Sequence, residues 1–256
     1  MSAESIRGPL PAVAFATALA VVVVSAGCGG ADESAEEAFR QSADALRARD
    51  YPAVVEAATR ATQIDSEHTG ALMNLGIAQS AQKNWTEAIA AYERVIELDP
   101  TQEKALNNLA NVYFRQGRYA EAGEWYRKAL EIDPNYLLAA FHYGWVLRQL
   151  NELEESERVF THCKEIPADN DRQRRTHLDC HFYLGTIRFR QGDYRTAAQV
   201  MEEVLAVYPG HPEARHFLGL SYRKMGRMED AARQLEIHRE ILRAMRSKPI
   251  PEPVDQ

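Results

Sequence analysis

Alanine, aromatic and proline residues recur along the chain at a constant interval of 34 residues. The segment NWTEAIAAYERVIELDP at 84–100 returns as RYAEAGEWYRKALEIDP at 118–134. Tyr92 and Tyr126 hold the same place in the two copies, and Pro100 and Pro134 end them. A fixed period of this length is typical of a stacked repeat array, so the sequence predicts repeated helix pairs rather than an irregular helical bundle.

Extending this register in both directions divides the chain into six units, called units 1 to 6 below. They span 35–68, 69–102, 103–136, 137–170, 178–211 and 212–245. Between units 4 and 5 the register slips by seven residues, in the charged segment 171–177. This insertion is expected either to lengthen a loop or to add a turn to the first helix of unit 5. Insertions in repeat arrays lie in loops and sometimes at binding faces.

Each unit is predicted to be two antiparallel helices that approach closely through small residues. The eighth position is small in every unit: Ser42, Gly76, Ala110, Gly144, Gly185 and Gly219. The twentieth position carries Val54, Ala88, Ala122, Ser156, Ala197 and Ala231. The twenty-fourth position carries a large apolar side chain in all units except the first, which has Ala58: Tyr92, Tyr126, Phe160, Met201 and Leu235. Gly117, Gly192 and Gly226 are expected to end first helices in the left-handed conformation.

This pattern resembles the tetratricopeptide repeat family over about residues 35–246. The resemblance implies an all-α fold, a right-handed α-solenoid or superhelix of six helix-turn-helix units. It also implies that the first helix of each unit lines a concave groove, which binds a protein or peptide ligand.

The groove residues are assigned from this resemblance. Unit 3 offers Asn107, Asn108 and Asn111, whose amides can hold the backbone of an extended peptide because they both donate and accept hydrogen bonds. The alternative is a solvated helix face.

Arginine and aromatic side chains occupy further groove positions. Arg115, Arg148, Arg190 and Arg223, with Arg47 and Lys224, form a cationic row that suits an acidic or C-terminal carboxylate ligand. They also lie in the last turns of their helices, where cations stabilise the helix dipole. Phe141, Trp145, Phe182, Tyr183 and Phe189 form an aromatic zone beside the row, either exposed to a ligand or packed between adjacent helices.

Composition and motifs limit the classes of function that the chain can have. The 256 residues are 45% hydrophobic and 26% charged, with a net charge of -7, which argues against nucleic-acid binding. The chain has no P-loop, nucleophile elbow, dinucleotide fingerprint or calcium loop. The histidines beside the cysteines (His162, His177, His181) lack zinc-ligand spacing. We therefore expect no catalytic activity, no cofactor and no metal.

Cys163 and Cys180 lie on either side of the insertion. They can form a disulfide in an oxidising compartment, or remain separate buried thiols.

The N-terminal region differs from the rest of the chain. Residues 12–24 are an apolar run, shorter than the roughly 20 residues of a membrane span, and fit a secretory signal. The run ends in SAGC at 25–28, which resembles the lipobox of bacterial lipoproteins, although Ser25 stands where leucine is usual. The resemblance implies that residues 1–27 are removed and that Cys28 is acylated. A simple cleaved secretory signal and an uncleaved anchor are the alternatives. We expect 28–34 to be a flexible spacer and 247–256 a disordered tail.

Together these features predict a non-catalytic scaffold that is exported and anchored in a membrane by lipid, facing the periplasm or the cell surface. A lipoprotein of this length with six repeats resembles the pilotins that help type IV pilus secretins assemble. It also resembles the repeat lipoproteins of outer-membrane protein assembly. A rival prediction is an accessory subunit of an enzyme, or a metal or thiol site at the insertion. A third is an oligomerisation module that uses the aromatic zone.

Overall fold

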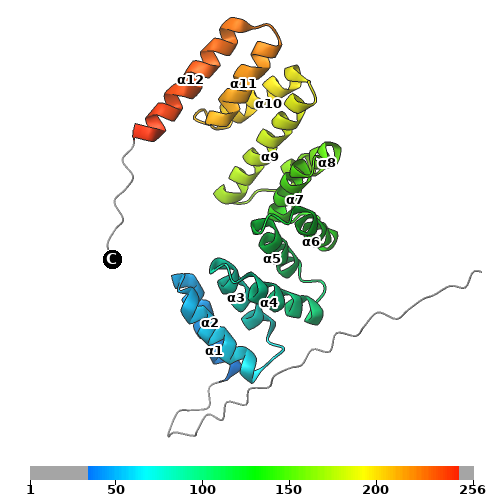
Figure 1. Ribbon diagram of the computed structural model, residues 1–256, viewed down its shortest axis with the longest axis vertical. Helices are drawn as coiled ribbons and strands as arrows, with labels where there is room; N and C mark the ends of the chain where they lie inside the picture. The colour runs from blue at the N-terminus through cyan, green and yellow to red at the C-terminus, as the bar shows by residue number, and fades with distance from the viewer. Residues whose placement is uncertain (1–33, 248–256) are drawn as a thin grey trace, which may run out of the picture. The chain divides into compact units, whose positions relative to one another are not determined.

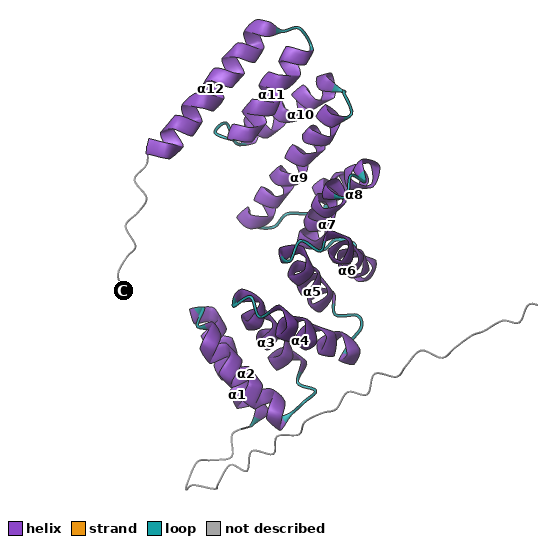
Figure 2. Cartoon of the chain, in the orientation of Figure 1, coloured by secondary structure: helices purple, strands orange, loops and turns teal. Residues whose placement is uncertain are grey.

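The computed structural model describes residues 34–247, and this part of the chain folds into helices joined by short turns. The helices are α1 (Ala35–Ala48), α2 (Tyr51–Ile64), α3 (Thr69–Ala81), α4 (Trp85–Leu98), α5 (Glu103–Arg115), α6 (Tyr119–Ile132), α7 (Leu137–Gln149), α8 (Leu153–Glu165), α9 (Asp171–Arg190), α10 (Tyr194–Val207), α11 (Pro212–Lys224) and α12 (Met228–Ser247). Figures 1 and 2 show them as successive antiparallel pairs, with no strand among the described residues. The predicted all-α array of helix pairs is confirmed.

The pairs stack in chain order. The second helix of each unit packs on the first helix of the next, as α2 does on α3 and α10 on α11. First helices of neighbouring units also contact each other in α1 and α3, α3 and α5, α7 and α9, and α9 and α11. No two second helices within 34–247 make comparable contact. The first helices therefore lie on the inner side of the stack, and the second helices on its outer side.

Small side chains at the eighth position allow each pair to close. A Cβ atom added at Gly76 would lie 2.6 Å from the ring of Tyr92, and one at Gly144 would lie 2.9 Å from the ring of Phe160. Gly185 faces Met201 in the same way, at 2.7 Å. Since these distances are shorter than any normal carbon contact, a side chain at these positions would push the two helices apart. The small residue at the eighth position thus makes room for the large side chain at the twenty-fourth position of the same unit.

A left-handed residue ends the first helix of every unit. Positive φ angles of 60–84° occur at one repeat position: Arg49, Lys83, Gly117, Asn151, Gly192 and Gly226. The three glycines were expected. The other three units reach the same conformation with a side chain present, in a region that L-residues seldom adopt.

Aspartates stabilise the turns between units 1 to 4. Asp65, Asp99 and Asp133 each accept a hydrogen bond from the backbone N–H two residues further on, at 3.0, 3.0 and 2.9 Å. The turn from unit 5 to unit 6 has Tyr208 at this position, with its side chain 51% exposed. This turn lacks the aspartate hydrogen bond of the others.

The insertion lengthens a helix rather than a loop. Segment 171–177 forms the first turns of α9, which has 20 residues where α7 has 13. Asn170 caps this helix, because its side chain accepts a hydrogen bond from the Gln173 N–H at 3.0 Å. Of the two predicted alternatives, the added helical turn is therefore the one observed.

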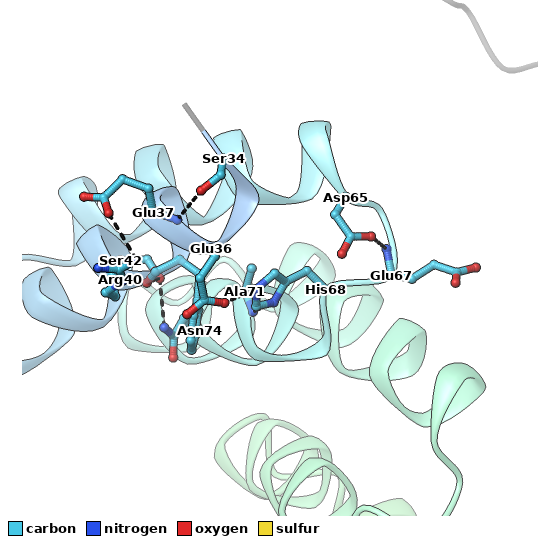
Figure 3. A network of polar contacts seen from close by, with 11 residues as sticks. Ser34, Glu36, Glu37, Arg40, Ser42, Asp65, Glu67, His68, Ala71 and Asn74 are labelled. Atoms are coloured by element: carbon cyan, nitrogen blue, oxygen red, sulfur yellow. Dashed lines mark hydrogen bonds and ion pairs between the residues drawn. The ribbon is translucent and has the colours of Figure 1, made fainter. Parts of the chain in front are cut away.

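The first two units are joined through a buried polar contact (Figure 3). The Asn74 amide on α3 donates to the Ser42 hydroxyl on α1 at 2.8 Å, and both side chains are buried. His68 caps α3 by accepting from the Ala71 N–H at 3.2 Å. Ser34 caps α1 in a similar manner. Asn74 has the repeat position in unit 2 that Asn108 has in unit 3, and here that position contacts unit 1.

Several predictions concern residues that lie outside the described part of the chain. They are the signal segment 1–27, most of the 28–34 spacer including Cys28, and all but the first residue of the 247–256 tail. Among the helices of 34–247, none combines the length and the apolar character needed to cross a bilayer.

Candidate peptide-binding face

The three asparagines of unit 3 differ in their access to the inner face. Asn107 is only 3% exposed, and its amide donates weakly to Asn108 at 3.4 Å. The Asn107 carbonyl oxygen is buried without a hydrogen-bond donor. Asn111 accepts a 2.6 Å hydrogen bond from the Tyr126 hydroxyl. Asn108 and Asn111, both partly exposed, are therefore better placed to contact a ligand than Asn107.

The four arginines predicted for the groove lie on first helices without acidic partners. Arg115, Arg190 and Arg223 are exposed, and Arg148 is half-buried. Within residues 34–247, none of the four forms an ion pair or a hydrogen bond. Arg47 differs, because it pairs with Asp44 on its own helix and so leaves the row.

Several arginines on the second helices show the opposite behaviour. Arg94 pairs with Glu97, Arg127 with Glu131 and Arg158 with Glu155. On a protein with a net charge of -7, a run of unpaired inner arginines makes the inner face locally cationic.

Arg148 is the most constrained of these cations. Its guanidinium lies over the ring of Tyr183, 5.0 Å from the ring centroid. Its Nε–H is buried and has no acceptor. Burial lowers the pKa of Arg148, and the neighbouring Arg190 lowers it further. Two guanidiniums therefore lie near each other on α7 and α9 with no carboxylate between them.

The predicted aromatic zone is mostly packing. Phe182 is buried in the core between units 5 and 6, and none of the other four rings is fully exposed. Trp145 packs edge-on against Phe114 at 4.9 Å, and Phe189 against Phe217 at 5.5 Å. The second alternative, rings packed between adjacent inner helices, accounts for most of these contacts. Tyr183 also contacts the Arg148 guanidinium with the face of its ring.

A contact between Tyr126 and His142 near the inner face was not predicted from the sequence. His142 stacks on Tyr126, with ring centroids 5.7 Å apart. Burial, with smaller contributions from the nearby Arg115 and Arg172, lowers the pKa of His142 to about 4. Arg172 belongs to the insertion, so the extended α9 adds a cation close to unit 4. The sequence located this charged insertion but did not predict that Arg172 lies near His142.

The cysteines are joined in the structure. Cys163 on α8 and Cys180 on α9 form a disulfide with Cα atoms 6.3 Å apart, and both residues are fully buried. Joined sulfurs cannot serve as free thiols or metal ligands. Among the described residues, no group of three or more histidine, cysteine, aspartate or glutamate side chains is placed to hold a metal.

The first turns of α9 border two open pockets. One, of about 500 Å³, lies towards unit 4 and includes Tyr136, Ile166 and Arg172. The other, of about 630 Å³, lies towards the turn between units 5 and 6 and includes Asp179, Val207 and Tyr208. Neither pocket was predicted from the sequence, although both result from the insertion that the sequence revealed.

Comparison with protein families gives matches in three segments. Residues 103–136 and 188–242 match families described as "Tetratricopeptide repeat", and residues 80–117 match one described as "TPR repeat". The chain contains tetratricopeptide repeats. The first match has the same bounds as the predicted unit 3, whereas the other two begin and end within units.

Solved structures of other tetratricopeptide repeat proteins share this fold. YrrB, described as a TPR protein with an unusual peptide-binding site, is 24% identical with a TM-score of 0.63, over 73% of this chain and 93% of that one. MamA is 20% identical with a TM-score of 0.63, over 72% and 97% of the two chains. A repeat protein from Parabacteroides merdae is 21% identical with a TM-score of 0.63, over 79% and 77%. No curated protein matches the chain in sequence.

Proposed function

We propose that this tetratricopeptide repeat protein is a non-catalytic, membrane-tethered scaffold that binds an extended acidic segment of a partner protein along the inner face of units 3 to 6. The observation that carries the proposal is the set of four inner arginines without ion pairs, on a protein that is acidic overall.

Helix dipoles alone do not account for this arrangement. Cations in a last helical turn gain about 0.3–1 kcal/mol from the dipole when exposed, and up to about 2 kcal/mol when partly buried. That gain requires neither a second cation beside Arg148 nor an N–H without an acceptor, and Arg148 has both. An unmade hydrogen bond of a buried donor costs about 1–3 kcal/mol, so the array gives up stability at this point. A carboxylate bound between them would offset one of the two positive charges and could accept a hydrogen bond from the buried Arg148 Nε–H.

Two further features support a peptide as the ligand. Asn108 and Asn111 lie one unit away from the arginine pair and offer amide groups to a peptide backbone. YrrB, which has the same fold, is described as having a peptide-binding site. That description concerns YrrB, and it adds weight here only because the inner face of this chain carries suitable groups of its own.

A selection of random twelve-residue displayed peptides against the purified protein tests the proposal. We expect the selected peptides to be enriched in aspartate and glutamate. Replacing both Arg148 and Arg190 by glutamine should weaken binding of a selected peptide at least about tenfold, because each charge-assisted hydrogen bond contributes about 1.5–3 kcal/mol. Binding should also weaken as salt is raised.

Arg127→Gln is the matched control, since it removes one positive charge from the outer helix α6. It should leave peptide binding within about twofold, because screening limits distant charges. Peptides without acidic enrichment, or equal loss of affinity in the control, would contradict an acidic ligand on the inner face.

The tethering part of the proposal rests on Cys28 and the apolar run before it. The protein would be held by its lipid at a membrane surface, facing the periplasm or the cell surface, and would assist assembly of an envelope complex. Metabolic labelling with a clickable palmitate analogue should mark the wild type and not Cys28→Ser. Label retained by the serine variant would reject acylation at this residue.

A further inference from the structure

Two departures from the repeat pattern meet in the pocket of about 630 Å³ beside α9. The first is the insertion 171–177, whose helical turns form one wall. The second is Tyr208, which occupies the position of the turn aspartates Asp65, Asp99 and Asp133. The two departures are separate in sequence, and the other units stack without either of them. Local rules broken without structural gain tend to mark functional sites.

The two walls of the pocket differ in chemistry. One wall comes from the end of α10, where the large apolar residues Val207 and Tyr208 are 74% and 51% exposed. The other wall is the face of α9 formed by Asp171, Arg174, Arg175, Leu178 and Asp179, and His211 completes the lining. A ligand in this pocket would therefore touch a hydrophobic surface on one side and charged groups on the other.

Of the two aspartates that α9 contributes to the pocket, only Asp171 has a basic partner. Arg174 forms an ion pair with Asp171, and Arg175 also lies near Asp171 and lowers its pKa. Asp179 has no ion pair or hydrogen bond within the described residues, although it is half-buried. Burial raises the pKa of Asp179, and only His211 acts in the opposite direction. The two arginines thus gather at Asp171 and leave Asp179 without a cation.

We propose that this pocket binds a lysine or arginine side chain of a partner protein. Its methylene stem would lie along Val207 and Tyr208, and its cationic end would pair with Asp179. Long basic side chains commonly combine an apolar stem with a charged end in this way, and an aromatic ring adds a cation–π contact.

This site does not depend on the arginine row of the proposed function. Asp179 lies 11 residues before Arg190 on α9, which corresponds to about 16 Å along a helix. The unpaired group of this pocket, Asp179, is an anion, whereas the unpaired groups of the arginine row are cations, so the two sites select opposite groups on a partner. Failure of one would leave the other unaffected.

A titration of the isotope-labelled full chain, followed by amide NMR shifts, tests the proposal. The probes are the capped tripeptides acetyl-Ala-Lys-Ala-amide and acetyl-Ala-Arg-Ala-amide, with glutamate and norleucine versions as comparisons. We expect a basic tripeptide to shift amides of 174–182 and 207–211. The norleucine and glutamate versions should bind at least about tenfold more weakly, because they lack the cation that pairs with Asp179.

Variants of the two aspartates distinguish the contact from a general charge effect. Asp179→Asn should abolish the response to the basic tripeptide, whereas Asp171→Asn, in the same pocket, should retain it. Tyr208→Ser should weaken the response, because it removes apolar surface without adding a charge. Equal binding of the norleucine version, unchanged binding by Asp179→Asn, or no shifts in these segments at 20 mM probe would overturn the proposal. A response to n-butylamine with none to either basic tripeptide would also reject a protein-borne side chain.

Discussion

The junction between units 3 and 4 and the junction between units 4 and 5 use the same repeat positions with different chemistry. In each, a ring at position 24 stacks on a ring at position 6 of the next unit. The pairs are Tyr126 with His142, at 5.7 Å, and Phe160 with Tyr183, at 5.4 Å. The first pair contains a titratable base and a hydrogen-bonded hydroxyl. The second pair packs in the same hydrophobic cluster as the disulfide.

The difference shows that two junctions of one array can share the same ring stacking and yet be stabilised by different interactions. The first junction keeps the short turn with Asp133, so its geometry is set by a local hydrogen bond. The second has lost that turn to the insertion, and a covalent link between α8 and α9 holds it instead. We therefore expect the first junction to respond to pH and the second to reduction.

The largest expected effect comes from the ring at the second junction. Phe160 is fully buried and fills the space opposite Gly144. Phe160→Ala should destabilise the protein by about 3–5 kcal/mol, since a buried phenylalanine leaves a cavity when truncated. Urea denaturation followed by circular dichroism measures this, and hydrogen exchange should show loss of protection in α7 to α9 first. Phe160→Leu, the control, should cost clearly less, and equal losses would show that the ring does not fill the space as described.

The disulfide gives the next effect. Replacing both Cys163 and Cys180 by alanine should lower stability by about 3 kcal/mol, because the link closes a segment with a sequence separation of 17 residues. Thermal denaturation of the oxidised wild type and of the double variant gives the comparison. Reductant should lower the melting temperature of the wild type alone. A double variant as stable as the wild type would mean that the helix contacts, rather than the covalent bond, hold this junction.

His142 makes the stability of the first junction depend on pH, because its pKa is lower in the folded protein than in the unfolded chain. Its pKa is about 4 in the folded protein and near 6.5 in an unfolded chain. Between these values the unfolded state holds more protons, so folding stability is full above about pH 7 and falls as the pH is lowered towards 4. The loss between pH 7 and pH 5 should be about 2 kcal/mol.

His142→Phe keeps a ring against Tyr126 and removes the titration. The difference in unfolding free energy between this variant and the wild type should therefore grow as the pH falls from 7 to 5. Because both proteins carry the same aspartates, their contribution cancels. A constant difference would show that His142 is not held neutral at this junction.

The smallest effect concerns the hydroxyl of the same pair. Burial raises the pKa of Tyr126, so its hydroxyl remains a donor to Asn111 throughout the accessible pH range. Tyr126→Phe should cost about 1 kcal/mol, the typical value of one hydrogen bond. A double-mutant cycle with Asn111→Ala isolates that contact. Additive effects of the two substitutions would indicate that the hydrogen bond contributes nothing to stability.

The periodicity of the sequence was sufficient to place the helix pairs, because Gly76 and Gly144 are small for a reason that is local to each pair. It also located the insertion, although the choice between loop and helix depended on capping by Asn170. The depth of each inner side chain was harder to predict. Repeat position decides which way Asn107 and Phe182 point, but the packing of the neighbouring unit decides that both are covered.

The arginine row could be read from the sequence as a set of positions, yet its unpaired state could not. That state depends on where every carboxylate lies in space. The pairing of Arg174 with Asp171 similarly leaves Asp179 alone, which no spacing rule would reveal. Tyr208, by contrast, could have been noticed as the one aromatic among the turn aspartates, once the turns were aligned.

The left-handed residues at the ends of the first helices mean that the array holds an unused margin of stability. Arg49 and Lys83 adopt a conformation that disfavours a side chain by about 1–2 kcal/mol, and glycine would relieve that strain. Both positions are exposed and remote from the inner face of units 3 to 6. A tougher version of this scaffold is therefore available through two substitutions that leave its recognition surfaces untouched.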